Sequence, residues 1–163
     1  MRISDDDYRW FAGRALDGMA TILTELGDER ANRRPPLPGA NTPYAIVTHC
    51  LGVLEFWVGA LVAGRPVERD RDAEFTASGP VAELLSRFAV AKERLRADLA
   101  AADSAAPLRA PAPPKYADTP AGRTQGGALQ HAYEELAQHH GQLELTRDIL
   151  CQGRPVSGSA GTV

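Results

Sequence analysis

Four long stretches of this chain carry apolar residues at the spacing of an α-helix, and segments rich in proline, glycine and polar residues separate them. The stretches cover residues 4–27, 41–64, about 80–102 and about 127–152. At these lengths they exceed typical β-strands. Helices with one apolar face bury that face against one another. The pattern therefore predicts an all-α fold, a four-helix bundle over residues 1–152, with a flexible C-terminal tail at residues 153–163.

The ends of these stretches carry residues that are typical of helix caps. Ser4 and Thr42 are expected N-caps, and Pro43 suits a first helical turn. Gly27 and Gly64 are expected to end the first two helices, because glycine readily adopts the left-handed conformation that follows a helix. The predicted loops are longer than most bundle turns, and long loops often build binding sites. They cover about residues 28–41, 65–78 and 103–126.

The composition is that of a globular protein, with 44% hydrophobic and 24% charged residues. A net charge of −3 gives no electrostatic footprint for nucleic acid. The N-terminus lacks the apolar run of a signal peptide, and no stretch reaches the ~18 uninterrupted apolar residues expected of a membrane span. Two cysteines do not make a disulfide framework. We therefore expect a cytoplasmic protein that binds neither nucleic acid nor membrane.

Three of the four histidines lie in one ten-residue stretch, "HAYEELAQHH" at residues 131–140. Residues four apart share a helix face, so His131, Glu135 and His139 form one polar column, which Gln142 extends. His140 points about 100° away from His139. The column is either the solvated face of a helix or part of a metal site. A partner elsewhere in the chain would favour the metal site.

His49, the fourth histidine, lies in the middle of the most apolar stretch, "AIVTHCLGVLEFW". A buried imidazole needs a hydrogen bond or a metal. Taken alone, such a histidine is more often a hydrogen-bonded core residue than a ligand. Its coincidence with the column of Glu135 and His139 changes the balance, since bundle cores build metal sites from inward-facing Glu and His side chains. Two imidazoles and one carboxylate fit an open catalytic zinc site.

Two segments resemble the DinB-like four-helix proteins, and the resemblance covers roughly residues 5–152. One is "PGANTPYAIVTHCLGVLEFWVGALVAG", which has the family's central histidine at His49 and its following acidic residue at Glu55. The other is "GRTQGGALQHAYEELAQHHGQLELTRDIL". It carries the family's second pattern at Glu134, Glu135, His139 and Gly141 to Leu143. Within this family the chain resembles especially the branch of mycothiol-dependent maleylpyruvate isomerases and related thiol transferases.

The resemblance implies up-down-down-up topology and a metal triad of His49, Glu135 and His139. Many DinB-like proteins have a third histidine where Glu135 stands, whereas the mycothiol-dependent branch has glutamate there. Some relatives have a histidine at the position of Gln142, so this chain lacks that ligand and its site is more open. Zinc is the expected metal, with nickel, iron and manganese as alternatives.

The implied function is that of a divalent-metal-dependent thiol S-transferase or thiol-dependent isomerase. In it, the metal activates a low-molecular-weight thiol such as mycothiol for attack on an electrophilic substrate. The expected assembly is a homodimer. Two alternatives stay open: a non-catalytic, stress-related metal-binding bundle, and a metal-dependent hydrolase that uses water as the nucleophile.

The other polar candidates carry weaker predictions. His131 is interpreted as a helix-surface histidine, with a second-shell or substrate-facing role as the alternative, and Gln142 is a second-shell candidate. His140 is expected to face solvent or an interface. Cys50 points to a different face from His49 and is expected to pack in the core. Glu55 is interpreted as a structural or capping partner. Three cationic residues are expected at the surface, with pairing to an anionic ligand as the alternative: Lys115, Arg123 and Arg147. Cys151 has no activating neighbour that the sequence identifies.

Overall fold

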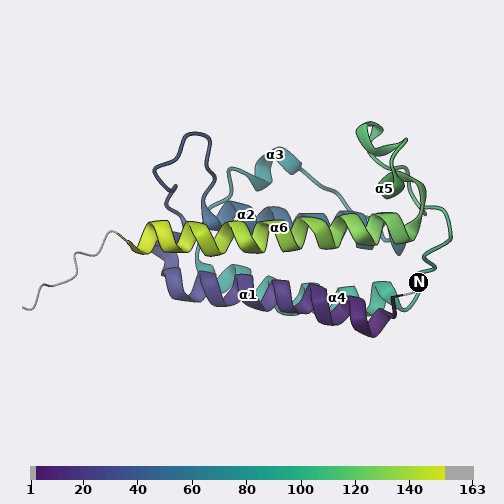
Figure 1. Ribbon diagram of the computed structural model, residues 1–163, viewed down its shortest axis with the longest axis horizontal. Coiled ribbons are helices and arrows are strands. Elements are labelled where there is room, and N and C mark those ends of the chain that lie inside the picture. The colour runs from purple at the N-terminus through teal and green to yellow at the C-terminus, as the bar shows by residue number, and fades with distance from the viewer. Residues whose placement is uncertain (1–2, 153–163) are drawn as a thin grey trace, which may run out of the picture.

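The structure, a computed structural model, describes residues 3–152 and confirms an all-α fold with four main helices packed together (Figure 1). The main helices are α1 (Asp5–Ala31), α2 (Pro43–Val53) with its π-helical continuation η1 (Leu54–Val62), α4 (Val81–Leu99) and α6 (Gln125–Cys151). Shorter helices interrupt the loops: α3 (Arg71–Glu74), η2 (Pro114–Tyr116) and α5 (Pro120–Arg123). The tail predicted at residues 153–163 lies outside the described residues.

The four main helices run up, down, down and up, as the family resemblance implies (Figure 1). Helices α1 and α6 pack together and run parallel, as a hydrogen bond between their N-terminal ends shows. The Tyr8 hydroxyl near the start of α1 donates to the carbonyl of Leu129 near the start of α6, at 2.7 Å. Helices α2 and α4 are also parallel. Arg65, just after η1, donates from Nε to Asp98 Oδ1 near the end of α4, at 2.8 Å. The connection through α3 therefore returns along the bundle, and α3 lies beside α2.

The core draws buried apolar side chains from all four main helices, as the periodicity predicts. Leu16, Ile46, Leu84 and Leu136 are examples that are fully or almost fully enclosed. Two apolar positions predicted for the first helix lie outside this core: Trp10 and Phe11 are 59% and 48% exposed. Their rings meet edge-to-face with centroids 4.9 Å apart, so they partly cover each other on the surface.

Helix α1 does not stop at Gly27, which corrects the sequence prediction. Gly27 breaks the helical conformation with φ 64° and ψ 176°, but helical turns resume and end at Ala31. The extension has a use, because the Asp28 carboxylate accepts a hydrogen bond from the backbone N–H of Val81 at 2.7 Å. Asp28 thus caps α4, whose own N-cap residue, Pro80, offers no side-chain acceptor. The last helix also begins earlier than predicted, with Thr124 as N-cap.

Gly27→Ala should destabilise the protein by about 1–3 kcal/mol, because this combination of φ and ψ is essentially restricted to glycine. The free energy of unfolding in denaturant measures the effect. Gly13→Ala is a matched control, since Gly13 lies within α1 and an added Cβ would meet nothing within 4 Å. That control should be neutral or slightly stabilising. An unchanged stability in Gly27→Ala would show that the break in α1 is not required.

The continuous helical span Pro43–Val62 is long and apolar enough to cross a membrane by length and composition alone, and 83% of its most apolar window is buried inside the bundle. This burial is typical of the central helix of a globular core. His49 therefore sits in the least solvated helix of the protein, with 3% of its surface exposed. Any polar contact that it makes is correspondingly important.

Candidate metal centre

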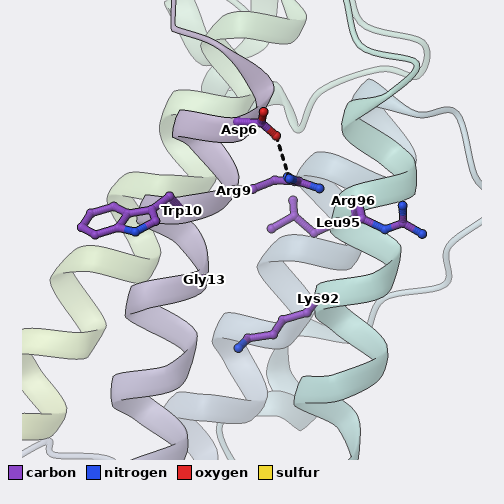
Figure 2. Close-up of a pocket in the computed structure, with 7 residues that line it drawn as sticks. All are labelled: Asp6, Arg9, Trp10, Gly13, Lys92, Leu95 and Arg96. Atoms are coloured by element: carbon purple, nitrogen blue, oxygen red, sulfur yellow. Dashed lines mark hydrogen bonds and ion pairs between the residues drawn. The ribbon is translucent and has the colours of Figure 1, made fainter.

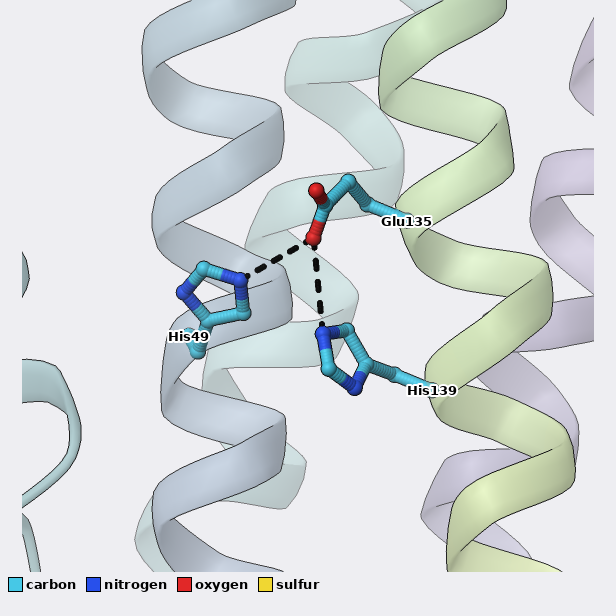
Figure 3. A group of neighbouring side chains, drawn as sticks. All are labelled: His49, Glu135 and His139. Carbon is cyan, nitrogen blue, oxygen red and sulfur yellow. Dashed lines mark hydrogen bonds and ion pairs between the residues drawn. The ribbon is translucent and has the colours of Figure 1, made fainter.

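His49, Glu135 and His139 converge between α2 and α6 (Figure 3). One ligand atom from each lies within 4.8 Å of the other two. A single carboxylate oxygen, Glu135 Oε2, lies 3.2 Å from His49 Nε2 and 3.4 Å from His139 Nε2. The structure thus brings together the three residues that the sequence proposes as a triad.

Helix geometry explains why these side chains meet. Glu135 and His139 are one turn apart on α6 and share a face, while their neighbour Leu136 is fully buried in the core. Helix α2 packs beside α6 and presents His49 to that face (Figure 3). The Glu135 and His139 side chains keep 24% and 23% of their exposure, against 4% for His49. The site is therefore anchored in the core at His49 and is open to solvent on the α6 side.

The far nitrogen of each triad imidazole has its own hydrogen-bond partner. His139 Nδ1 lies 2.8 Å from Gln142 Oε1, and His49 Nδ1 lies 2.9 Å from Glu74 Oε2. An amide or carboxylate oxygen accepts, so each contact favours a proton on Nδ1. With Nδ1 occupied in this way, Nε2 of both rings is the nitrogen that faces the centre of the triad, where a metal ion would replace the proton that each Nε2 shares with Glu135.

Glu74 and the residues around it were not predicted from the sequence to belong to the site. Glu74 lies on α3, is 7% exposed, and receives two hydrogen bonds from the Arg69 guanidinium, at 2.6 and 2.8 Å. Phe75 stacks on the His49 ring with centroids 4.7 Å apart. The only sequence signal is the charged run "VERDRDAEF", which is equally typical of a solvated loop. The contact between Glu74 and His49 depends on how the segment after η1 folds back over α2.

The contacts shift the pKa values of the carboxyls and of His49 in opposite directions. Hydrogen bonds from His139 and His49 hold the pKa of Glu135 well below its usual range. Burial lowers the pKa of His49, but hydrogen bonds with Glu135 and Glu74 outweigh it, so the net pKa is raised. Burial raises the pKa of Glu74, but hydrogen bonds from Arg69 and His49 bring it below the ordinary value. Both glutamates are therefore ionised near neutral pH.

The donor set and its spacing fit a divalent metal. Zinc bonds of about 2.0–2.2 Å to imidazole nitrogen or carboxylate oxygen place neighbouring tetrahedral donors about 3.3–3.5 Å apart. The two separations that involve Glu135 Oε2, 3.2 and 3.4 Å, are close to this value. Three protein ligands would leave a coordination position for an external molecule.

Residues 13–143, most of the chain, match the model of the DinB superfamily. The protein belongs to the DinB superfamily. The match covers the whole triad, from α2 to α6. The comparison with curated proteins found no match to this chain. Membership in the DinB superfamily confirms the family resemblance and is consistent with the helical bundle.

His131 is not the surface histidine that its main interpretation predicts. In this DinB protein its side chain is only 11% exposed, and its ring centroid lies 4.4 Å from that of Trp57 and 4.7 Å from that of Tyr116. Its Nε2 lies 3.7 Å from Glu135 Oε1, the carboxylate oxygen that does not contact the other two histidines. Tyr116 on η2 and Trp57 on η1 thus hold His131 beside the triad, next to Glu135.

His131→Ala should keep close to one metal ion per chain, because its nitrogens face the outer oxygen of Glu135 and the exposed Glu134 rather than the triad's centre. Elemental analysis of the purified variant measures this. His140→Ala is the paired control, since His140 packs against Gly18 of α1, away from the triad. Loss of metal on removing His131 would make it a ligand and overturn the assignment of the triad.

The remaining candidates have other roles in this DinB protein. Cys50 is fully buried, as predicted, and burial raises the pKa of its thiol far above the ordinary value, with Glu135 and Glu74 adding to the effect. Cys50 is therefore not a ready nucleophile. Glu55 is a structural partner, since its two oxygens accept hydrogen bonds from Arg65 at 2.9 Å and Arg94 at 2.6 Å. The pair with Arg94 joins η1 to α4, and the pair with Arg65 joins η1 to the segment that follows it.

A separate groove of about 470 Å³ lies between α1 and α4 (Figure 2). Each of its three cationic residues has an acidic partner: Arg9 donates to Asp6 at 2.7 Å, Lys92 pairs with Asp17, and Arg96 Nε lies 3.5 Å from Glu93 Oε2. None of the triad residues lines it. The candidate metal centre and this groove are therefore independent features of the bundle.

Proposed function

We propose that this DinB protein binds one divalent metal ion through His49, Glu135 and His139, and that it activates a low-molecular-weight thiol for attack on an electrophile. The observation that carries the proposal is the shared contact of one Glu135 oxygen with Nε2 of both histidines. Glutamate between the two histidines is the pattern of the mycothiol-dependent branch, which supports the choice of a thiol. Zinc is the expected ion because two imidazoles and one carboxylate form an open zinc site.

A metal ion in this site would supply the positive charge that favours the thiolate, the nucleophilic form of the thiol. The protein's part is to hold the ligands and to control access. His49 is fixed in the core, whereas Glu135 and His139 line the side that solvent reaches. A thiol entering from that side would lose its proton to solvent. Its sulfur would then form a bond to the electrophilic carbon, and a proton would return to the substrate's adjacent carbon in an addition.

Residues near the triad could orient thiol and substrate. His131 and Tyr116 form a partly exposed wall beside Glu135, and the Lys115 ammonium lies 4.6 Å from the centroid of the Tyr116 ring. This wall offers a planar surface and one positive charge. An electrophile with an unsaturated, anionic framework would be complementary to it in charge and shape.

The test is a thiol-conjugation assay with metal-loaded protein, mycothiol or glutathione, and a generic electrophile that absorbs on conjugation. The expected result is turnover that requires both metal and thiol. In addition, cobalt-substituted protein should develop a sulfur-to-cobalt charge-transfer band when the thiol is added. The Glu135→Ala variant should show neither signal. Glu134→Ala is the matched control, since its exposed side chain makes no contact with His49 or His139.

The two alternatives predict different results in the same assay. A hydrolase would act on ester or amide substrates with no dependence on thiol. A non-catalytic metal-binding bundle would bind metal and give no turnover with any thiol or electrophile. Metal-loaded protein that neither binds nor reacts with the thiols would contradict the proposal and favour the non-catalytic bundle.

A cytoplasmic location, the absence of nucleic-acid and membrane partners, and a homodimeric state form part of the same proposal. The net charge of −3 supports the absence of a nucleic-acid partner. Exposed Trp10 and Phe11 on α1 provide an apolar surface for a second copy. Light scattering coupled to size exclusion should give twice the 17.5 kDa mass of the chain. A monomer at micromolar concentration would contradict the dimer without affecting the metal proposal.

A further inference from the structure

The contact between His49 and α3 goes beyond the triad. We infer that Glu74, held by Arg69 and given room by Gly52, is a positioning residue that fixes His49 in the orientation and tautomer needed to bind metal through Nε2. This inference deepens the proposed function and rests on it for the metal. None of the three is a proposed metal ligand. Glu74 lies on α3, Arg69 in the segment that leads into α3, and Gly52 on α2.

The contacts of Nδ1 decide the tautomer of His49. Two groups approach its Nδ1: Glu74 Oε2 at 2.9 Å and the Arg69 guanidinium at 3.4 Å. The guanidinium only donates, and it would require an unprotonated Nδ1 and a proton on Nε2. However, the same Arg69 nitrogen donates to Glu74 Oε2 at the shorter distance of 2.8 Å. The carboxylate is therefore the partner of Nδ1. Nε2 faces Glu135 Oε2 at 3.2 Å, on the side of the triad, and is the nitrogen that a metal would take in place of a proton.

The contacts of Glu74 and Phe75 hold the His49 ring in one orientation. Glu74 accepts from Arg69 through both oxygens, at 2.6 and 2.8 Å, in the paired geometry typical of a strong arginine–carboxylate interaction. The side chains of Glu74 and His49 keep only 8% and 4% of their exposure. Phe75 stacks on the imidazole ring. The ring is thus held at its edge by Glu74 and on one face by Phe75, so little rotation remains.

Gly52 makes the space that the Glu74 carboxylate occupies. Gly52 lies three residues after His49 and so shares its face of α2. A Cβ added at Gly52 would lie 2.0 Å from Glu74 Oε1 and 2.7 Å from its carboxyl carbon. Glycine at this position therefore allows the carboxylate to lie against the helix and reach Nδ1. An alanine there would force Glu74 away while improving the intrinsic helix propensity of α2.

A carboxylate that orients a metal-binding histidine typically contributes about 10- to 100-fold to metal affinity. Glu74→Ala should weaken the affinity of the protein for Co²⁺ and Zn²⁺ by about that factor. Glu74→Gln keeps an acceptor oxygen without the charge, so its loss should be smaller. Gly52→Ala should resemble Glu74→Ala, although every ligand and Glu74 itself are still present. Gly13→Ala is the control for the glycine replacement and should bind like the parent.

The experiment combines competition titrations with Co²⁺ and Zn²⁺, the visible spectrum of the cobalt form, and nuclear magnetic resonance of the metal-free protein. In the metal-free parent, the Nδ1 proton of His49 should give a downfield signal protected from exchange. Glu74→Ala should lose that protection. Thermal unfolding of each metal-free variant identifies any that fail to fold, and Glu74→Gln then carries the test.

The outcomes separate this inference from the proposed function. If the parent binds metal and both Glu74 variants match its affinity and cobalt spectrum, the positioning role is wrong and the metal site stands. If Gly52→Ala binds like the parent, the role given to Gly52 is wrong. If the parent binds no metal but its Nδ1 proton is protected in a Glu74-dependent manner, the orientation of His49 by Glu74 is supported and the proposed function is wrong.

Discussion

Glu135→Ala should abolish stoichiometric metal binding, with a loss of affinity greater than the roughly 100-fold that an outer contact can account for. Glu135 contacts both histidines, through a single oxygen 3.2 Å from His49 Nε2 and 3.4 Å from His139 Nε2. Its removal takes away the only carboxylate of the triad and the charge that balances the cation. Isothermal titration with Zn²⁺ and elemental analysis of purified protein would both measure the loss.

The neighbouring glutamate makes this test specific. Glu134→Ala removes the same charge from the same helix, but Glu134 is 56% exposed and pairs with Gln138 and His131 instead. It should bind metal like the parent. His49→Ala and His139→Ala should lose metal as Glu135→Ala does, while His140→Ala should keep it. Equal affinities in the Glu134 and Glu135 variants would mean that the triad is a hydrogen-bonded cluster and not a metal site.

Leu136→Ala should lower the free energy of unfolding by about 2–5 kcal/mol, the range for truncating an enclosed leucine. Leu136 is fully buried and next to Glu135 in sequence, yet the helix turns it into the core. The measurement is denaturant unfolding of metal-free protein with a chelator present, because bound metal would itself stabilise the fold. Gln138→Ala, on the exposed face of α6, should change stability by less than about 0.5 kcal/mol.

Stability and binding should separate in these variants. Leu136→Ala should still bind close to one metal ion under conditions where it is folded, since its side chain does not face the triad. Glu135→Ala should change the stability of the metal-free protein far less than Leu136→Ala does. A Leu136 variant as stable as the parent would show that α6 is not packed as the structure describes.

The triad could be predicted because it depends mostly on local geometry. Residues four apart on a helix share a face, so Glu135 and His139 had to be neighbours once that stretch was recognised as helical. The position of His49 in the most apolar stretch required a polar partner. The pattern of the two segments then suggested that these groups meet. Packing of α2 beside α6 confirms that they do.

What the sequence did not predict depends on contacts between distant segments. Glu74 reaches His49 only because the segment after η1 folds back along α2, and nothing in the charged run around Glu74 specifies that path. The burial of His131 likewise depends on Tyr116, which a long loop brings to it. Helical turns resume after Gly27, and the residues beyond it make contacts with a distant segment. Asp28 accepts a hydrogen bond from the backbone N–H of Val81 at the start of α4, and Asn32 accepts one from the backbone N–H of Gly79 just before that helix.

Exposed aromatic residues illustrate a second limit. Trp10 and Phe11 fit the apolar periodicity of the first helix, yet both lie at the surface. Periodicity assigns a residue to a face, but the width of the buried stripe depends on how closely the neighbouring helices approach. For α1 those neighbours are mainly α6 and α4. Their positions are set by the whole bundle.

The metal content and metal coordination of the parent protein test most directly whether His49, Glu135 and His139 bind a metal ion. Protein expressed with Zn²⁺ in the medium and purified without chelators should contain close to one ion per chain. X-ray absorption at the zinc edge should show two imidazole nitrogens and one carboxylate oxygen, and the imidazole contribution should fall to one in His139→Ala if that variant retains residual metal. Metal-free parent protein, or metal that persists at full occupancy without Glu135, would contradict the account.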